Sequence, residues 1–271
     1  HILFWNAFMV TAALADGGKI EGALLVILGS VILGVISTVF PALIMPYVAR
    51  LTGTREFSIG HTTTILAILG AWIGKLVGDP ATSTEELEIP KRWAFIKEMV
   101  VSTSAIMLLV YVIMGLLEGP TWAAGEFAGG SILVWSLWMI YQAISFGAGL
   151  VILLTGVRMT LGEIVPAFHG IANRVVPEAV PALDCPMIFP YAPNALALGF
   201  PIAVAASLVT LVVFGLAGFP YVLLPLVVAA FFDVGPAAIL ANETGGIRGA
   251  VAASIVGGVL LIVFQALSLF F

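Results

Sequence analysis

The stretch GALLVILGSVILGVISTVFPALIMPYV, Gly22–Val48, decides the class of fold. It contains no Asp, Glu, Lys or Arg, and apolar side chains fill most of its positions. A helix needs about 20 predominantly apolar residues to cross the hydrocarbon core of a bilayer, and this stretch exceeds that length. It therefore predicts a membrane-spanning helix.

The composition of the whole chain agrees with a membrane protein. Of its 271 residues 61% are hydrophobic and 9% are charged, with a mean hydropathy of +1.17. Soluble domains carry about 25% charged residues, so the surplus apolar surface must face lipid. The net charge of −5 excludes nucleic acid as an expected partner. The single Cys185 excludes an internal disulfide, and the three histidines lack metal-ligand spacing, so we expect no metal and no cofactor.

The other apolar segments predict a multi-span, all-α integral membrane protein. Some are interrupted by Gly, Pro and Thr, which favours re-entrant or bent segments, and irregular backbone at membrane depth needs cover by protein or a water-filled cavity. We therefore expect a substrate site at the broken segments. Besides Gly22–Val48, the predicted spans are Met99–Leu117, Ser131–Thr155, Ala195–Gly218 and Ala250–Phe271; Ile2–Leu14 predicts the tail of a truncated span, and the broken segments are Ile59–Gly78 and Pro220–Phe232.

The cations predict how Ile59–Gly78 lies in the membrane. Lys and Arg are enriched in cytoplasmic loops. If this segment enters and leaves on one face, five cations lie together in the cytoplasm, and Glu118–Gly130, which has no Lys or Arg, lies outside. We therefore predict that the segment is re-entrant. The five cations are Arg50, Arg55, Lys91, Arg92 and Lys97.

Polar stretches predict the connections between these segments. Thr82 or Ser83 is a candidate cap for the acidic residues that follow it. The stretch after Thr155 is amphipathic and predicts an interfacial helix that positions its neighbours. The predicted connections are the mixed-charge loop Asp79–Arg92, the Gly-rich acidic Glu118–Gly130, the amphipathic Gly156–Pro181 and the polar Asp233–Arg248.

A first candidate site lies in Phe57–Thr64, FSIGHTTT. It places the His61 imidazole and three Thr hydroxyls at the mouth of an apolar segment, where they can hydrogen-bond a polyhydroxylated substrate. The alternative is structural: the hydroxyls bond to helix carbonyls and His61 caps a helix or lies at the interface.

A second candidate site is Ala182–Asn194, ALDCPMIFPYAPN. Its three prolines exclude a regular helix, and Asp184 is an ionisable group in an apolar setting. The alternative interpretation is a surface loop in which Asp184 caps the residues from Met187 onward. Cys185 is interpreted as a small core residue and not as a nucleophile.

Several motifs, in order and at matching spacing, make the chain resemble the ascorbate-specific EIIC permease family of the bacterial sugar phosphotransferase systems. The resemblance extends from His1 to near the end of the chain. The motifs are HILF at His1–Phe4, FSIGH at Phe57–His61, EELEIP at Glu85–Pro90, VSTS at Val101–Ser104, the pattern of Gly156–Cys185, APNA at Ala192–Ala195 and AN..GG.R.A at Ala241–Ala250.

This resemblance implies most of the functional expectations. The chain would be a fragment, truncated at both ends, of one permease domain with internal inverted repeats, in a homodimer in the bacterial inner membrane. It would move L-ascorbate inward for phosphorylation by a partner EIIB subunit. The implied substrate-binding residues are His1, His61 and Asp184, together with Trp5 and Thr62, where the family usually carries Gln. These two departures favour a related sugar acid.

Two other functions are compatible with the residues. A proton-coupled secondary transporter of a small polar or anionic substrate would use Asp184 or His61 as its coupling group. A membrane scaffold or receptor is disfavoured by the broken, polar segments. The chain offers no nucleophile of its own, so we expect a transport subunit of a phosphotransferase complex.

Overall fold

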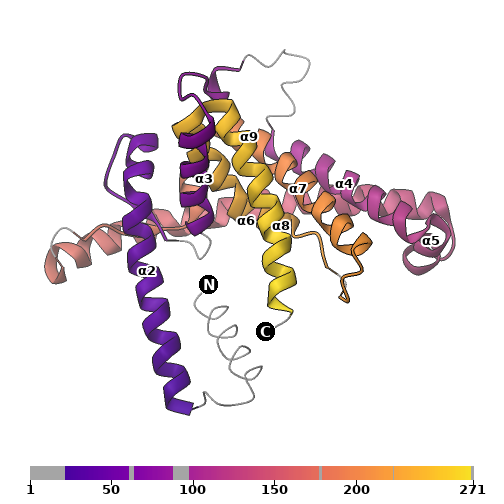
Figure 1. The fold of residues 1–271 in the computed structure, drawn as a ribbon, viewed down its shortest axis with the longest axis horizontal. Helices are drawn as coiled ribbons and strands as arrows, with labels where there is room; N and C mark the ends of the chain where they lie inside the picture. Colours follow the sequence, from indigo (N-terminus) through magenta and orange to yellow (C-terminus); the bar gives the residue numbers. More distant parts are fainter. Residues whose placement is uncertain (1–21, 61–63, 88–97, 177–178, 222, 270–271) are drawn as a thin grey trace. The chain divides into compact units, whose positions relative to one another are not determined.

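The structure is a computed structural model that describes residues 22–60, 64–87, 98–176, 179–221 and 223–269 (Figure 1). Four of the five predicted site residues, His1, Trp5, His61 and Thr62, lie outside these ranges, as does Ile2–Leu14. The chain divides into two compact units. The first comprises residues 1–86 and 168–271, and the second comprises residues 87–167.

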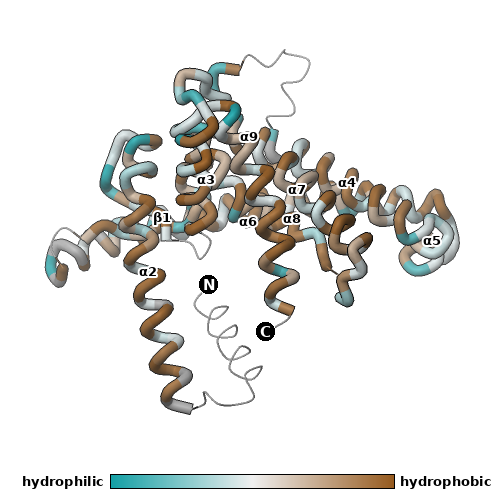
Figure 2. Tube along the Cα trace, in the orientation of Figure 1, coloured by the Kyte–Doolittle hydropathy of each residue, from teal (hydrophilic) through white to brown (hydrophobic). Residues whose placement is uncertain are grey.

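Long apolar helices confirm the multi-span, mostly helical class. Within the described residues, five helical stretches are long and apolar enough to cross a membrane. Many of their large hydrophobic side chains are exposed, and α2 consists of apolar residues over most of its length (Figure 2). Lipid is the environment that this surface requires. The long helices are α2 Gly22–Thr52, α4 Met99–Glu118, α6 Ile132–Val175, α7 Pro193–Leu216 and α9 Gly235–Ser268.

Two predicted connections are wrong: one lies within the second unit, and the other runs past its last residue in the chain. Glu118–Gly130 is not a loop, because α5, Pro120–Ala128, begins with Pro at its first turn and ends at Gly129 in the left-handed conformation. The interfacial helix expected from Gly156 is not separate, because α6 continues for 44 residues through Pro166. Gly156 does not adopt the positive φ that ends helices, so nothing stops α6 at Thr155.

A short parallel strand pair in the first unit was not expected from an all-α sequence. Strand β1, Ser58–Ile59, pairs with β2, Ala182–Leu183. The Ser58 hydroxyl also donates a hydrogen bond of 2.7 Å to the Pro41 carbonyl of α2. The contact ties β1 to α2 at one of the two prolines inside this helix.

Helix α3, Thr64–Val77, returns the chain from β1 toward the end of α2. Lys75 in its last turn donates to the Tyr47 hydroxyl at 3.1 Å, whereas β1 contacts α2 at Pro41, further from its C-terminal end. At 1.5 Å per residue, α3 is about 20 Å long, shorter than the roughly 30 Å of hydrocarbon. This geometry fits the predicted re-entrant segment, and the membrane face on which it opens stays a prediction.

The loop after α3 contains η1, Thr84–Glu86. The Ser83 hydroxyl accepts a hydrogen bond of 3.2 Å from the Glu85 amide, as predicted for a cap. The Thr82 hydroxyl instead donates to the Asp79 carbonyl at 2.8 Å.

Helix α9 folds back on itself. Gly245 and Gly246 have non-helical backbone angles, and Gly246 has φ 59° and ψ −153°, a conformation that glycine alone adopts readily. A Cβ at Gly249 would lie 2.5 Å from the Ala241 carbonyl oxygen, and one at Gly257 would lie 2.6 Å from Val234. Residues eight apart in a straight helix are separated by about 12 Å, so the two arms of α9 form an antiparallel hairpin.

The hairpin corrects the prediction for Asp233–Arg248. This stretch was expected as a polar connection before a span at Ala250, but the helix begins at Gly235, and its polar residues Asn242 and Thr244 are buried. The Asn242 carboxamide oxygen accepts from the Thr84 amide at 2.8 Å, and the Thr244 hydroxyl donates to the Ala71 carbonyl at 2.9 Å. Internal partners replace water, so the polar side chains tolerate burial.

The segment before this hairpin is irregular, as predicted for Pro220–Phe232. It contains α8, Val227–Ala229, and the π-helical turn η4, Ala230–Val234. A π-turn inserts an extra residue and is frequent at functional sites.

Glycines allow α3 to approach the first arm of α9. Gly70, Gly74 and Gly78 are spaced by four residues and face Ala237, Ala241 and Gly245, which have the same spacing. A Cβ at Gly70 would lie 2.5 Å from the Ala237 carbonyl oxygen. Small residues at this spacing let membrane helices pack backbone to backbone, because bulkier side chains would separate them.

Candidate functional site

The strand pair joins the two motifs that the sequence singled out. The Ser58 amide donates to the Pro181 carbonyl at 3.0 Å, and the Gly60 amide donates to the Leu183 carbonyl at 2.8 Å. Gly60 directly precedes His61 in the chain, and Leu183 directly precedes Asp184. The backbone therefore delivers both candidate motifs to the same end of one strand pair, although more than 100 residues separate them.

Asp184 lies at the start of η3, the seven-residue 3₁₀-helix Cys185–Tyr191. Its carboxylate accepts a hydrogen bond of 2.8 Å from the Cys185 amide, and its carbonyl accepts from the Met187 amide at 3.2 Å. The predicted capping contact is thus present, at Cys185 and not at Met187. The absence of a regular α-helix in this segment is also confirmed, with Pro186 and Pro190 inside η3.

Cys185 is a core residue, as predicted. Its side chain is buried, and its thiol donates to the Phe232 carbonyl at 3.2 Å. A buried thiol in apolar surroundings is a poor nucleophile, because the reactive thiolate form is disfavoured there.

Asp233 is a further candidate site residue that the sequence interpretation missed. It lies in the π-turn η4, is half-buried, and directly follows Phe232, whose carbonyl accepts the hydrogen bond of the Cys185 thiol. The signal was present as one acidic residue in the apolar run AAFFDVG, Ala229–Gly235, where ionisable groups tend to be functional. It passed unnoticed because the stretch was interpreted as a connection.

Asp184 and Asp233 are both half-buried residues of the first unit. From Asp233 to the hairpin turn at Gly245, a helical rise of 1.5 Å per residue gives about 18 Å. The turn is surrounded by polar residues, among them Asp79, Thr82 and Glu243, which places it at a membrane surface in our interpretation.

A second polar cluster at the hairpin turn is structural. The Glu85 carboxylate accepts from the Ala195 amide at 2.9 Å and from the Asn194 amide at 3.2 Å, which caps the start of α7. The Asn194 side chain donates to the Thr84 carbonyl at 3.1 Å. With Asn242 these residues join η1, α7 and α9, so Glu85, Asn194 and Asn242 hold these elements together.

The described residues contain no cluster of three or more His, Cys, Asp or Glu side chains that could hold a metal ion. The arrangement at Asp184 is instead one of hydrogen-bond acceptors. Carboxylates accept hydrogen bonds from hydroxyl groups, and ionised acceptors make the stronger bonds.

These features define a class: a multi-span helical membrane protein whose discontinuous helices and strand pair hold half-buried carboxylates. The chain belongs to the family of sugar-specific permease components of the phosphotransferase system, EIIC-GAT, which it matches over residues 1–270. It is therefore a multi-span protein of the cytoplasmic membrane.

A curated relative supports this assignment at lower similarity. The chain is 26% identical to the ascorbate-specific PTS system EIIC component of Mycoplasma pneumoniae, over 92% of this chain. It spans 41% of the length of that relative.

Proposed function

We propose that this chain forms the translocation pathway of a phosphotransferase permease that moves L-ascorbate or a related sugar acid. The family and the name of the Mycoplasma relative support the sugar class. The observation that carries the proposal is the strand pair, which brings Asp184 and the chain before His61 to one point in the interior of the first unit.

The chemistry of this point suits a hydroxylated ring. The Asp184 carboxylate would accept hydrogen bonds from vicinal hydroxyls, and the imidazoles of His1 and His61 would donate to the enolate or carbonyl oxygens. Trp5 and Thr62 would complete the contacts. Because neither supplies the two-sided carboxamide of a Gln, the substrate is a relative of ascorbate with fewer polar contacts.

The phosphoryl group would come from a partner EIIB subunit. Cys185 is buried, so a partner protein cannot reach its thiol, which makes it unsuitable as a phosphoryl carrier. The chain then supplies binding and translocation, and the functional assembly is a homodimer of permease subunits that EIIB approaches from the cytoplasm. A mass measurement of the protein in mild detergent should find two copies, and a monomer that transports would exclude the dimer.

Transport into membrane vesicles tests the coupling. With phosphorylated EIIB inside the vesicles, radiolabelled ascorbate or a related sugar acid should accumulate as its phosphate ester. Without EIIB, the labelled sugar should not accumulate.

The half-buried carboxylates Asp184 and Asp233 also suit proton-coupled transport, the second candidate. In that case the unmodified sugar would accumulate under an imposed pH gradient without EIIB. Accumulation of this kind would overturn the phosphotransferase proposal, whereas no transport of any sugar acid would overturn the assigned substrate class.

A further inference from the structure

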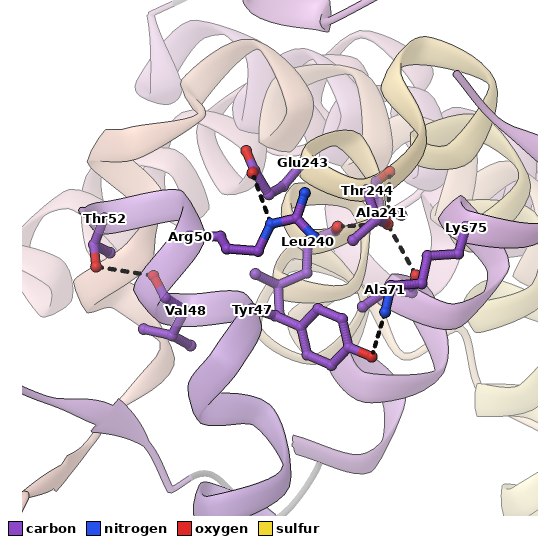
Figure 3. Close-up of polar contacts among 10 residues, drawn as sticks. All are labelled: Tyr47, Val48, Arg50, Thr52, Ala71, Lys75, Leu240, Ala241, Glu243 and Thr244. Carbon is purple, nitrogen blue, oxygen red and sulfur yellow. Dashed lines mark hydrogen bonds and ion pairs between the residues drawn. The ribbon is translucent and has the colours of Figure 1, made fainter. Parts of the chain in front are cut away.

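A second polar group, remote from Asp184, lies where α2 meets α3. The Tyr47 hydroxyl of α2 accepts a hydrogen bond of 3.1 Å from the Trp72 indole and another of 3.1 Å from the Lys75 ammonium. The ammonium also lies 4.6 Å from the centroid of the Tyr47 ring (Figure 3). We call Tyr47, Trp72 and Lys75 the aromatic–lysine triad.

The triad has hydrogen-bond donors to spare. An ammonium carries three N–H donors. Among the described residues, Lys75 contacts the side chain of Tyr47, whose hydroxyl accepts one of these donors. Tyr47 accepts two bonds, so its own O–H remains a donor. The triad therefore offers several donors and one positive charge at one point, which suits a phosphate group.

The surroundings of the triad are those of a lipid-facing surface. Next to it, Leu43 is 52% exposed, Trp72 itself 54% and Leu76 83%. Beyond it, toward the end of α2, the exposed Arg50 pairs with Glu243 at 3.8 Å, so this carboxylate has a cation other than Lys75 as its partner (Figure 3). Trp, Tyr and Lys at the limit of an apolar helix face are typical of the headgroup level of a bilayer.

We propose that the aromatic–lysine triad binds the phosphate headgroup of an anionic phospholipid. The acyl chains lie along the exposed apolar residues of α2 and α3, and the phosphate contacts Lys75 and the Tyr47 hydroxyl. Since Tyr47 belongs to α2 and Lys75 to α3, the lipid stabilises the contact between these helices. The proposal is independent of the transported substrate.

Native mass spectrometry of the detergent-solubilised chain, titrated with phosphatidylglycerol or phosphatidylcholine, tests the site. Phosphatidylglycerol should bind more tightly, and Lys75→Gln should weaken its binding about fivefold, the usual effect of one basic residue at a membrane surface. Lys75→Arg should retain the binding, and Tyr47→Phe should weaken it. Arg158→Gln is the matched control, because Arg158 is an exposed cation in the second unit.

Three results would overturn the proposal. One is equal weakening by Arg158→Gln and Lys75→Gln, which would indicate an unspecific charge effect. Another is displacement of the lipid by millimolar inorganic phosphate, which would indicate a site for free phosphate. The third is unchanged lipid binding in Lys75→Gln and Tyr47→Phe, when both variants keep the melting temperature of the parent. This third result includes the case in which the two variants lose affinity for a phosphorylated protein partner and not for the lipid.

Discussion

Replacement of Asp184 tests the proposed substrate site most directly. The carboxylate accepts a hydrogen bond from the Cys185 amide at 2.8 Å and thereby begins η3. Asn carries an amide oxygen that can accept the same bond, and Asn caps helices as well as Asp does. Asp184→Asn therefore removes the charge and keeps the local fold, whereas Asp184→Ala removes both.

The two variants have different expected magnitudes. Loss of the cap in Asp184→Ala should lower the free energy of unfolding by about 1 kcal/mol, and Asp184→Asn should change it little. A hydrogen bond to a charged group contributes about 1.5–3 kcal/mol. At about 1.4 kcal/mol per decade, its loss should weaken substrate binding roughly ten- to a hundredfold. Asn should retain part of the binding, and Ala very little.

Equilibrium binding and vesicle uptake of labelled ascorbate or a related sugar acid, measured on both variants, separate three roles. Substrate contact predicts graded losses of binding from Asn to Ala. Proton coupling predicts near-normal binding with no accumulation in either variant. A purely structural cap predicts an Asn variant like the parent.

Asp79→Asn is the matched control, because the exposed Asp79 carboxylate also accepts a backbone bond, of 2.9 Å from the Ala81 amide. It should leave both binding and uptake unchanged. Normal binding and uptake in a well-folded Asp184→Ala variant would refute the site assignment.

Three further predictions address the fold and the specificity. Gly74→Leu should destabilise the protein by about 1–3 kcal/mol in thermal unfolding, because its Cβ would meet the Ala241 carbonyl oxygen. The control Gly156→Leu, at a position with open space around it, should not destabilise the protein. Equal melting temperatures of the two variants would contradict the α3–α9 packing. Gly246→Ala should cost about 1–3 kcal/mol for the strained backbone alone, and an unchanged unfolding free energy would count against the hairpin turn. Combined Trp5→Gln and Thr62→Gln should raise the affinity for ascorbate in the binding assay, and no change would remove both residues from the proposed site.

The spans could be predicted from the sequence because their signal is local. Each of Gly22–Val48, Met99–Leu117 and Ala195–Gly218 has enough consecutive apolar residues to cross a bilayer, and the helices α2, α4 and α7 correspond to them. Helix boundaries were less predictable. The pattern changes from apolar to amphipathic after Thr155, and this change was interpreted as the end of a helix. The helix α6 instead continues to Val175.

The candidate site was predictable in part. Asp184 was identified as an ionisable residue among prolines, and the structure places it at the start of η3. Asp233 had a local signal, as one acidic residue in an apolar run, but its stretch was interpreted as a connection. The supporting residues Glu85 and Asn242 were not predictable, because their significance depends on partners more than 100 residues away in the chain, in α7 and η1.

The sequence alone determined that this chain is an integral membrane protein, that some of its apolar segments are broken and that its polar motifs resemble those of a permease family. Composition and hydropathy suffice for the membrane location and the broken segments, and the order and spacing of short motifs carry the resemblance. Tertiary structure decided that Asp233–Arg248 belongs to a buried hairpin and that Ser58–Ile59 pairs with Ala182–Leu183. The physical reason is that a buried polar group is stable only with an internal partner, and the partners of Asn242, Thr244 and the β1 backbone come from distant parts of the chain.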